Sequence, residues 1–308
     1  MQAAIDIRGL TKDYGAGRGL FDLDLQIDAG DVFGYLGPNG AGKTTTIRLL
    51  MGMLHPTRGR ASIFGLDCHQ DAVAVKKQVG YLPGELPQFG GLRGTEVVAY
   101  IAGLRGGCDR GLVRQICERL DLDLGRRFRE YSRGNKQKLG ILLALMHRPR
   151  LLILDEPTGG LDPLNQQEFY DLVREARAAG ATVLFSSHIL SEVEDVCDRV
   201  GIIRRGRLVR VAEMEELHDI RYHHVTVEFD GEPPEAEVRM AAGVENLTRA
   251  GNELRFAVRG SFQPVVSMLH GHPVLKLISH EPSLEEIFLA YYEDEPAPSA
   301  ELVPAPAP

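Results

Sequence analysis

Gly37-Pro38-Asn39-Gly40-Ala41-Gly42-Lys43-Thr44 fits the pattern G-x-x-x-x-G-K-[ST], which forms a phosphate-binding loop where it joins a strand to a helix. The apolar run Val32–Leu36 before it predicts a buried strand, and residues 44–54 after it predict a helix. This helix is expected to stop before His55-Pro56, because a proline disfavours helical geometry in the residue that precedes it. Both elements that the motif requires are therefore expected on its two sides.

The composition of this stretch suits phosphate chemistry. Glycines let the backbone curl so that successive N–H groups point at phosphate oxygens. The helix that begins near Lys43 adds unpaired amides and about half a positive charge. We expect Lys43 to contact β- and γ-phosphates, the Thr44 hydroxyl to ligate Mg²⁺ and Thr45 to lie near the α-phosphate. The residues expected to bind ATP here are Gly37, Pro38, Asn39, Gly40, Ala41, Gly42, Lys43, Thr44 and Thr45.

Polar side chains also follow two further predicted strands. The strand Leu151–Asp155 is followed by Glu156, and because side chains alternate along a strand the two acids need not share a role. We expect Asp155 to hold Mg²⁺ through a coordinated water and Glu156 to polarise the attacking water as the general base. His188 follows the strand Thr182–Ser187, at the sheet edge where open α/β folds bind ligands. An uncharged imidazole there is expected to hold the γ-phosphate and the attacking water.

A further segment lies between the phosphate loop and the strand that ends in Asp155. It reads Tyr131-Ser132-Arg133-Gly134-Asn135-Lys136-Gln137 and resembles the LSGGQ signature of ABC ATPases. The resemblance implies that this segment closes over the ATP held by a partner subunit. Ser132 and the Gly134 backbone would then donate hydrogen bonds to the γ-phosphate. Tyr14 is similar to the aromatic residue that stacks on adenine in this family. Asp162 is similar to the D-loop residue that links the two nucleotide sites of a dimer.

The signature departs from the family pattern at two positions. Arg133 stands where the family usually has glycine, and Asn135 where it usually has glutamine. An S-R-G-N signature resembles that of bacterial exporter ATPases for drugs, lipids or polymers. The departures therefore imply a subgroup with a working site.

The Q-loop departs further. After residues 79–83 the family often has a glutamine that contacts Mg²⁺ and water and senses the membrane partner, whereas this chain has Gly84. Glu85 follows directly and would reach the metal as a carboxylate, or Gln88 would do so if the loop bends. The sequence leaves both alternatives open, and Glu85 is a candidate metal ligand.

The chain is expected to hold two domains and a tail. Residues 1–217 predict an α/β P-loop NTPase domain of the ABC ATPase type, with a helical subdomain at about 86–148. Residues 218–293 predict a small α+β domain of the split βαβ kind, which resembles the accessory domain of the exporter subgroup. The Pro/Ala-rich residues 294–308 are expected to be disordered. In the small domain, strands are expected at 225–229, 244–248, 253–258 and 274–280, and helices at 263–270 and 283–292.

Composition excludes several classes of protein. The 308 residues carry a formal net charge of -8, which argues against nucleic acid as a partner because such proteins need a concentrated basic surface. The basic run Arg204, Arg205 and Arg207 is expected to be a solvated face. The four scattered cysteines form no C-x-x-C pair. The start has no signal-peptide pattern, and the longest apolar stretch is well short of the roughly 20 residues of a spanning helix. We expect a cytoplasmic protein without direct membrane insertion.

These observations favour an ATP-binding and ATP-hydrolysing motor subunit of an ABC transporter, and the signature favours an exporter. It would pair with itself or with a related ATPase subunit, and drive a separately encoded membrane permease that contacts the groove near residues 93–104. The alternative is a soluble ABC-type ATPase acting on ribosomes or DNA. The single phosphate loop and the short stretch between Lys43 and Asp155, without room for a coiled coil, favour the transporter. A P-loop kinase would leave the Ser132 segment, Glu156 and His188 without a role.

Overall fold

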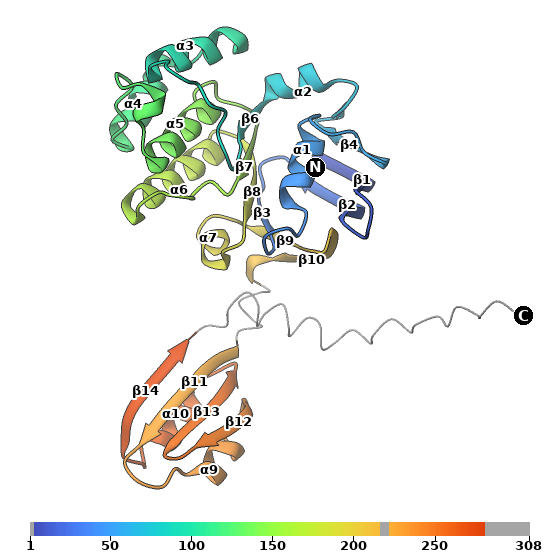
Figure 1. The fold of residues 1–308 in the computed structure, drawn as a ribbon. Coiled ribbons are helices and arrows are strands. Elements are labelled where there is room, and N and C mark those ends of the chain that lie inside the picture. The colour runs from blue at the N-terminus through green and yellow to red at the C-terminus, as the bar shows by residue number, and fades with distance from the viewer. Residues whose placement is uncertain (1–2, 216–221, 281–308) are drawn as a thin grey trace, which may run out of the picture. The chain divides into compact units, whose positions relative to one another are not determined.

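The computed structural model describes residues 3–215 and 222–280, and the chain divides into two compact units after Met214 (Figure 1). The larger unit contains a six-stranded sheet and a four-stranded sheet with helices around them. Within its described residues, the smaller unit contains a separate four-stranded sheet with two helices.

The six-stranded sheet runs in the order β10-β9-β3-β8-β7-β6 and is parallel except for β10. Every residue of β3, β7 and β8 is buried, as expected for parallel strands covered on both faces. The three strands predicted from the sequence are confirmed with unchanged bounds. The strands are β3 (Val32–Leu36), β6 (Val79–Leu82), β7 (Leu151–Asp155), β8 (Thr182–Ser187), β9 (Arg199–Arg204) and β10 (Arg207–Glu213).

The second sheet is antiparallel, in the order β2-β1-β4-β5. Its apolar residues share one core with β3 and the helix α1, as Ile5, Leu23, Phe33, Tyr35 and Ile47 illustrate. This packing fixes α1 against both sheets and so positions the loop that precedes it. The strands are β1 (Ala3–Asp13), β2 (Gly19–Asp28), β4 (Arg58–Ile63) and β5 (Leu66–Asp67).

The helices α3, α4 and α5 gather on one side of the six-stranded sheet, beyond β6 and β7 (Figure 1). α1 ends at Leu50, four residues before the predicted end. The helix ends early because Gly52 adopts φ +60° and packs against Cys68. A Cβ at Gly52 would lie 2.5 Å from the carbonyl oxygen of Cys68. The helices are α1 (Lys43–Leu50), α2 (Ala72–Gln78), α3 (Gly94–Arg105), α4 (Arg110–Arg119), the 3₁₀ turn η1 (Phe128–Glu130), α5 (Arg133–Leu145), α6 (Pro163–Ala178) and α7 (Leu190–Glu194). No helix in the described ranges is both long and apolar enough to cross a membrane.

In the smaller unit the sheet order is β12-β13-β11-β14. β13 lies between β11 and β12 and is antiparallel to both, so β11–α9–β12 forms the expected split βαβ unit. Val225, Val227 and Phe229 of β11 point into its core. The sequence did not predict α9, and the helix predicted at 283–292 and the tail 294–308 lie outside the described residues. The elements are β11 (Tyr222–Phe229), α9 (Glu235–Met240), β12 (Val244–Ala250), β13 (Glu253–Arg259), α10 (Gln263–Leu269) and β14 (Val274–His280).

Candidate active site

The phosphate-loop residues curl between β3 and α1, as the motif predicts. Gly42 precedes α1 with φ +117°, a conformation that residues with a Cβ rarely adopt. A Cβ at Gly37 would lie 2.3 Å from the carbonyl oxygen of Ile203. The turn between β9 and β10 supports the loop, because the Gly206 N–H donates to the carbonyl of Ala41 at 2.8 Å. The loop is thus fixed by its neighbours as well as by its own glycines.

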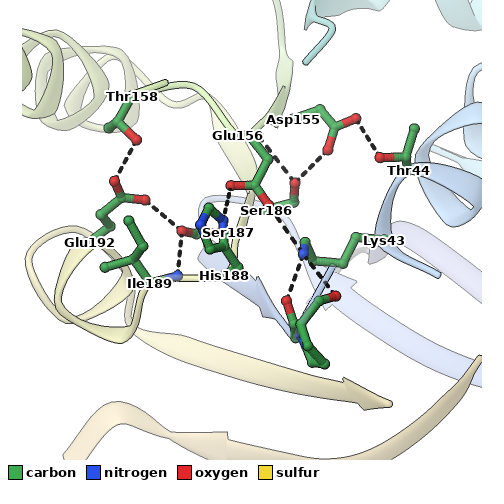
Figure 2. A network of polar contacts seen from close by, with 12 residues as sticks. Lys43, Thr44, Asp155, Glu156, Thr158, Ser186, Ser187, His188, Ile189 and Glu192 are labelled. Atoms are coloured by element: carbon green, nitrogen blue, oxygen red, sulfur yellow. Dashed lines mark hydrogen bonds and ion pairs between the residues drawn. The ribbon is translucent and has the colours of Figure 1, made fainter. Parts of the chain in front are cut away.

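Lys43 opens α1 and is only 5% exposed. Its ammonium group donates to the carbonyl of Gly37 at 2.6 Å. It also forms an ion pair with Glu156, with 3.1 Å between Nζ and Oε1 (Figure 2). A buried cation is stable only when it is paired and hydrogen-bonded. Here the Glu156 carboxylate compensates the charge and the Gly37 carbonyl accepts a hydrogen bond.

Asp155 is 2% exposed at the end of β7 and accepts two hydrogen bonds. The Thr44 hydroxyl donates to its Oδ2 at 3.0 Å and the Ser186 hydroxyl to its Oδ1 at 2.7 Å. The pKa of Tyr81, on neighbouring β6, is raised to about 12, mainly by burial and further by the Asp155 charge. The Thr44 and Asp155 oxygens are of the hard kind that Mg²⁺ prefers, so the residues present fit a bound Mg²⁺.

Glu156 follows β7 with φ +51°, an uncommon backbone conformation for a residue other than glycine. Its N–H donates to the carbonyl of Ser186 at 3.1 Å, which holds this turn in place. The side chain lies between Lys43 and His188, whose Nδ1 donates to Glu156 Oε2 at 2.6 Å (Figure 2). The structure therefore brings together three residues that the sequence placed in one site.

A cavity of about 500 Å³ opens beside the phosphate loop. Tyr14 lines it and is 50% exposed, with the ammonium of Lys12 5.6 Å from its ring centre. Arg18 and Arg205 also line it, although the sequence analysis assigned Arg205 to a solvated face. Its position could have indicated this. Arg205 follows β9, which is the parallel neighbour of β3, so both strands end at the sheet edge that carries the phosphate loop. The lining residues are Tyr14, Gly17, Arg18, Gly19, Asn39, Gly40, Ala41, Gly42, Lys43, Thr44, Thr45, Glu156 and Arg205.

The Ser132 segment forms the start of α5 and does not contribute to the lining of this cavity. The Ser132 hydroxyl accepts from the Asn135 N–H at 3.2 Å and caps the helix. Gly134 lies against the loop after Glu156, so closely that a Cβ would be 2.7 Å from the carbonyl oxygen of Gly160. Gln137, which the sequence analysis did not single out, donates to the carbonyl of Pro157 at 2.7 Å in the same loop. The start of α5 is therefore fixed to the segment that carries Glu156.

Asp162 is exposed and caps α6, where it accepts hydrogen bonds from Asn165 at 3.0 and 2.6 Å. The backbone N–H and the side-chain amide of Asn165 lower the pKa of Asp162, in that order of importance. Its carboxylate is thus held at the N-terminus of α6.

Gly84 of the Q-loop lies close to Asp155. A Cβ at this position would lie 3.6 Å from the backbone oxygen of Asp155 and 3.7 Å from its Oδ2. Glu85 and Gln88 are both exposed. A side chain at position 84 would thus start beside Asp155, but this chain has glycine there.

Several known proteins resemble this chain in sequence and in fold. The sequence profile of the ABC transporter family matches residues 20–159. The bacitracin transport ATP-binding protein BcrA of Enterococcus faecalis is 36% identical over 233 residues, which cover 75% of each chain. The Nod factor export ATP-binding protein I of Burkholderia orbicola is 31% identical over 292 residues, covering 93% of this chain and 96% of the relative.

A solved ATP-binding subunit of an ABC transporter has the same fold, with a TM-score of 0.64 and 29% identity. The match covers 70% of this chain and 92% of that one. The P-loop fold, the phosphate loop and the full-length similarity agree with one another. The chain therefore belongs to the family of ABC transporter ATP-binding subunits and is an ABC ATPase.

Proposed function

We propose that this ABC ATPase is the motor subunit of an exporter and that two ATPase subunits close around two ATP molecules. The observation that carries the proposal is the placement of Glu156. Its carboxylate lies 3.1 Å from Lys43 Nζ and 2.6 Å from His188 Nδ1, beside the phosphate loop. A base, a cation for phosphate and a second polar group thus meet where hydrolysis requires them.

In this mechanism Lys43 binds the β- and γ-phosphate oxygens, which compete with Glu156 for the ammonium group. Glu156, once released from Lys43, accepts a proton from the attacking water. His188 holds the water and the γ-phosphate, while Tyr14 stacks on the adenine. Thr44 and Asp155 would hold Mg²⁺, which would supply positive charge next to the phosphates.

The Ser132 segment supplies the far wall of the partner subunit's site. Its absence from the cavity lining of its own chain supports this assignment. Ser132 and the Gly134 N–H bind the γ-phosphate at the N-terminus of α5, and Asp162 links the two sites. Removal of the γ-phosphate then separates the subunits. Other nucleotide switches likewise release a segment once the γ-phosphate that held it is gone.

The membrane partner is a separately encoded permease, which contacts the surface near the Q-loop and residues 93–104 and is driven by closure of the dimer. The names of the relatives, bacitracin transport and Nod factor export, support an exporter. The protein then works at the cytoplasmic face of the cell membrane, attached through the permease. The Q-loop role falls to Glu85 or Gln88, or is carried by the backbone at Gly84.

The test is Glu156→Gln in the full chain. Because glutamine cannot accept the proton, steady ATP hydrolysis should fall at least about 100-fold, while ATP binding persists and a closed dimer accumulates. Turnover is measured by phosphate release and the dimer by size-exclusion chromatography with ATP. Glu118→Gln, an exposed carboxylate on α4, is the matched control. Turnover of Glu156→Gln at the rate of the unchanged protein would refute the general-base assignment.

A further inference from the structure

Glu192 is a buried carboxylate on α7 that the proposed chemistry does not use. It is 6% exposed, and glutamate is almost never so buried unless its charge has partners. It belongs to none of the motifs described above. Its place in the network of Figure 2 suggests why a carboxylate stands there.

Both oxygens of Glu192 accept a hydrogen bond from a hydroxyl group. Thr158 Oγ1 donates to Oε1 at 2.5 Å, and Ser187 Oγ donates to Oε2 at 2.5 Å (Figure 2). Hydrogen bonds to a carboxylate are roughly twice as strong as those between neutral groups. Glu192 therefore joins two segments that are 29 residues apart in the chain, counting from position 158 to position 187.

The two segments are those that carry Glu156 and His188. Thr158 lies two residues after Glu156, and the Gly159 N–H donates to the Glu156 carbonyl at 3.3 Å. Ser187 directly precedes His188, and its Oγ also accepts from the Ile189 N–H at 2.9 Å. The Ser187 hydroxyl thus fixes the backbone on both sides of His188 and is itself oriented by Glu192.

We propose that Glu192 is a positioning residue that keeps His188 Nδ1 in contact with Glu156 Oε2. It does so by holding the loop after β7 and the loop after β8 at a fixed separation. The inference rests on the proposed roles of Glu156 and His188. A hydrophobic side chain could fill the same volume at lower desolvation cost, but it could not orient two hydroxyls at once.

The first experiment compares two variants of the full chain. Glu192→Met removes both acceptors at similar volume, whereas Glu192→Gln retains the shape and one acceptor. We expect kcat for ATP hydrolysis to fall about 50-fold in Glu192→Met and about fivefold in Glu192→Gln, with KM for ATP within about twofold of the unchanged protein. Asp195→Asn removes an exposed carboxylate just beyond α7 and is the matched control.

The second experiment repeats Glu192→Met in a His188→Ala background. If Glu192 acts through the His188–Glu156 contact, the further loss of kcat should be less than about twofold, because the contact is already gone. The same 50-fold loss in both backgrounds would overturn the inference. So would an unchanged kcat per ATP-binding site accompanied only by a lower melting temperature, which would indicate a purely structural residue.

Glu156→Gln is measured beside these variants to separate two kinds of failure. If Glu156→Gln turns over ATP normally, the proposed general base is wrong and the positioning role loses its basis. If Glu156→Gln is inactive but Glu192→Met keeps its kcat, only the positioning role fails.

Discussion

At the scale of single residues, Glu156 combines an uncommon backbone conformation with a side chain that is paired with the phosphate-loop lysine. Its φ of +51° turns it away from the direction of β7, and strain of this kind clusters at functional sites. Its carboxylate shares Lys43 with the carbonyl of Gly37. In the proposed mechanism, phosphate oxygens that approach Lys43 displace this carboxylate. We therefore propose that ATP binding and release of the base are coupled through one ammonium group.

His147, two residues beyond the end of α5, has a pKa that its surroundings displace. Burial and the nearby Arg105 guanidinium, in that order, lower the pKa of His147 from 6.5 to about 4. The unfolded chain therefore binds a proton between pH 6.5 and 4 that the folded chain does not bind. The free energy of unfolding should fall as the pH decreases through this window.

His147→Gln, neutral at every pH and still able to accept from Arg105, should lose less stability over that window. Denaturant melts at pH 6.5, 5.5 and 4.5 measure the effect, with the exposed His69→Gln as control. Identical pH profiles for His147→Gln and the unchanged protein would contradict the assigned pKa.

At the scale of elements, the sequence predicted what depends on local pattern. β3, β7 and β8 were found because buried parallel strands form short continuous apolar runs. The end of α1 was missed because it depends on a close approach of Gly52 to Cys68, sixteen residues later. The nearness of Gly84 to Asp155 depends likewise on the pairing of β6 with β7. Local motifs indicate the candidate reacting groups, and only the fold shows which neighbouring residues hold them in place.

The start of α5 allows a prediction that separates folding from function. Ser132→Asp retains the cap on the Asn135 N–H, because aspartate is as good an N-cap as serine. It also places a negative charge where the partner's γ-phosphate would bind. We expect thermal stability to be retained, ATP binding to the monomer to be unchanged, and ATP-dependent dimerisation to weaken at least about tenfold.

The control is Ser132→Ala, which loses the cap and about 1 kcal/mol of stability but adds no charge. A loss of ATP binding to the Ser132→Asp monomer would place the segment in the site of its own chain. Gly134 is unsuitable for this test, since a side chain there would collide with Gly160 of the same chain.

At the scale of the whole molecule, each unit has a hydrophobic cluster built from its own residues. The cluster around α1 draws on both sheets of the larger unit. The cluster of the smaller unit joins β11 and β13 to α9 and α10. A unit with its own core can in principle fold alone. We therefore propose that the boundary at residues 217–218 separates two independent domains.

A fragment of residues 1–217 should fold, bind ATP and hydrolyse it at a rate within about threefold of the full chain, because every residue assigned to the site precedes position 217. A fragment of residues 218–308 should fold separately and show no ATPase activity. Circular dichroism and thermal melts test folding, and phosphate release tests activity. If 1–217 aggregated while the full chain stayed soluble, the boundary would be misplaced. If 1–217 folded and bound ATP but did not hydrolyse it, the smaller domain would be needed for closure of the dimer. In that case the fragment would also fail to dimerise when ATP is added.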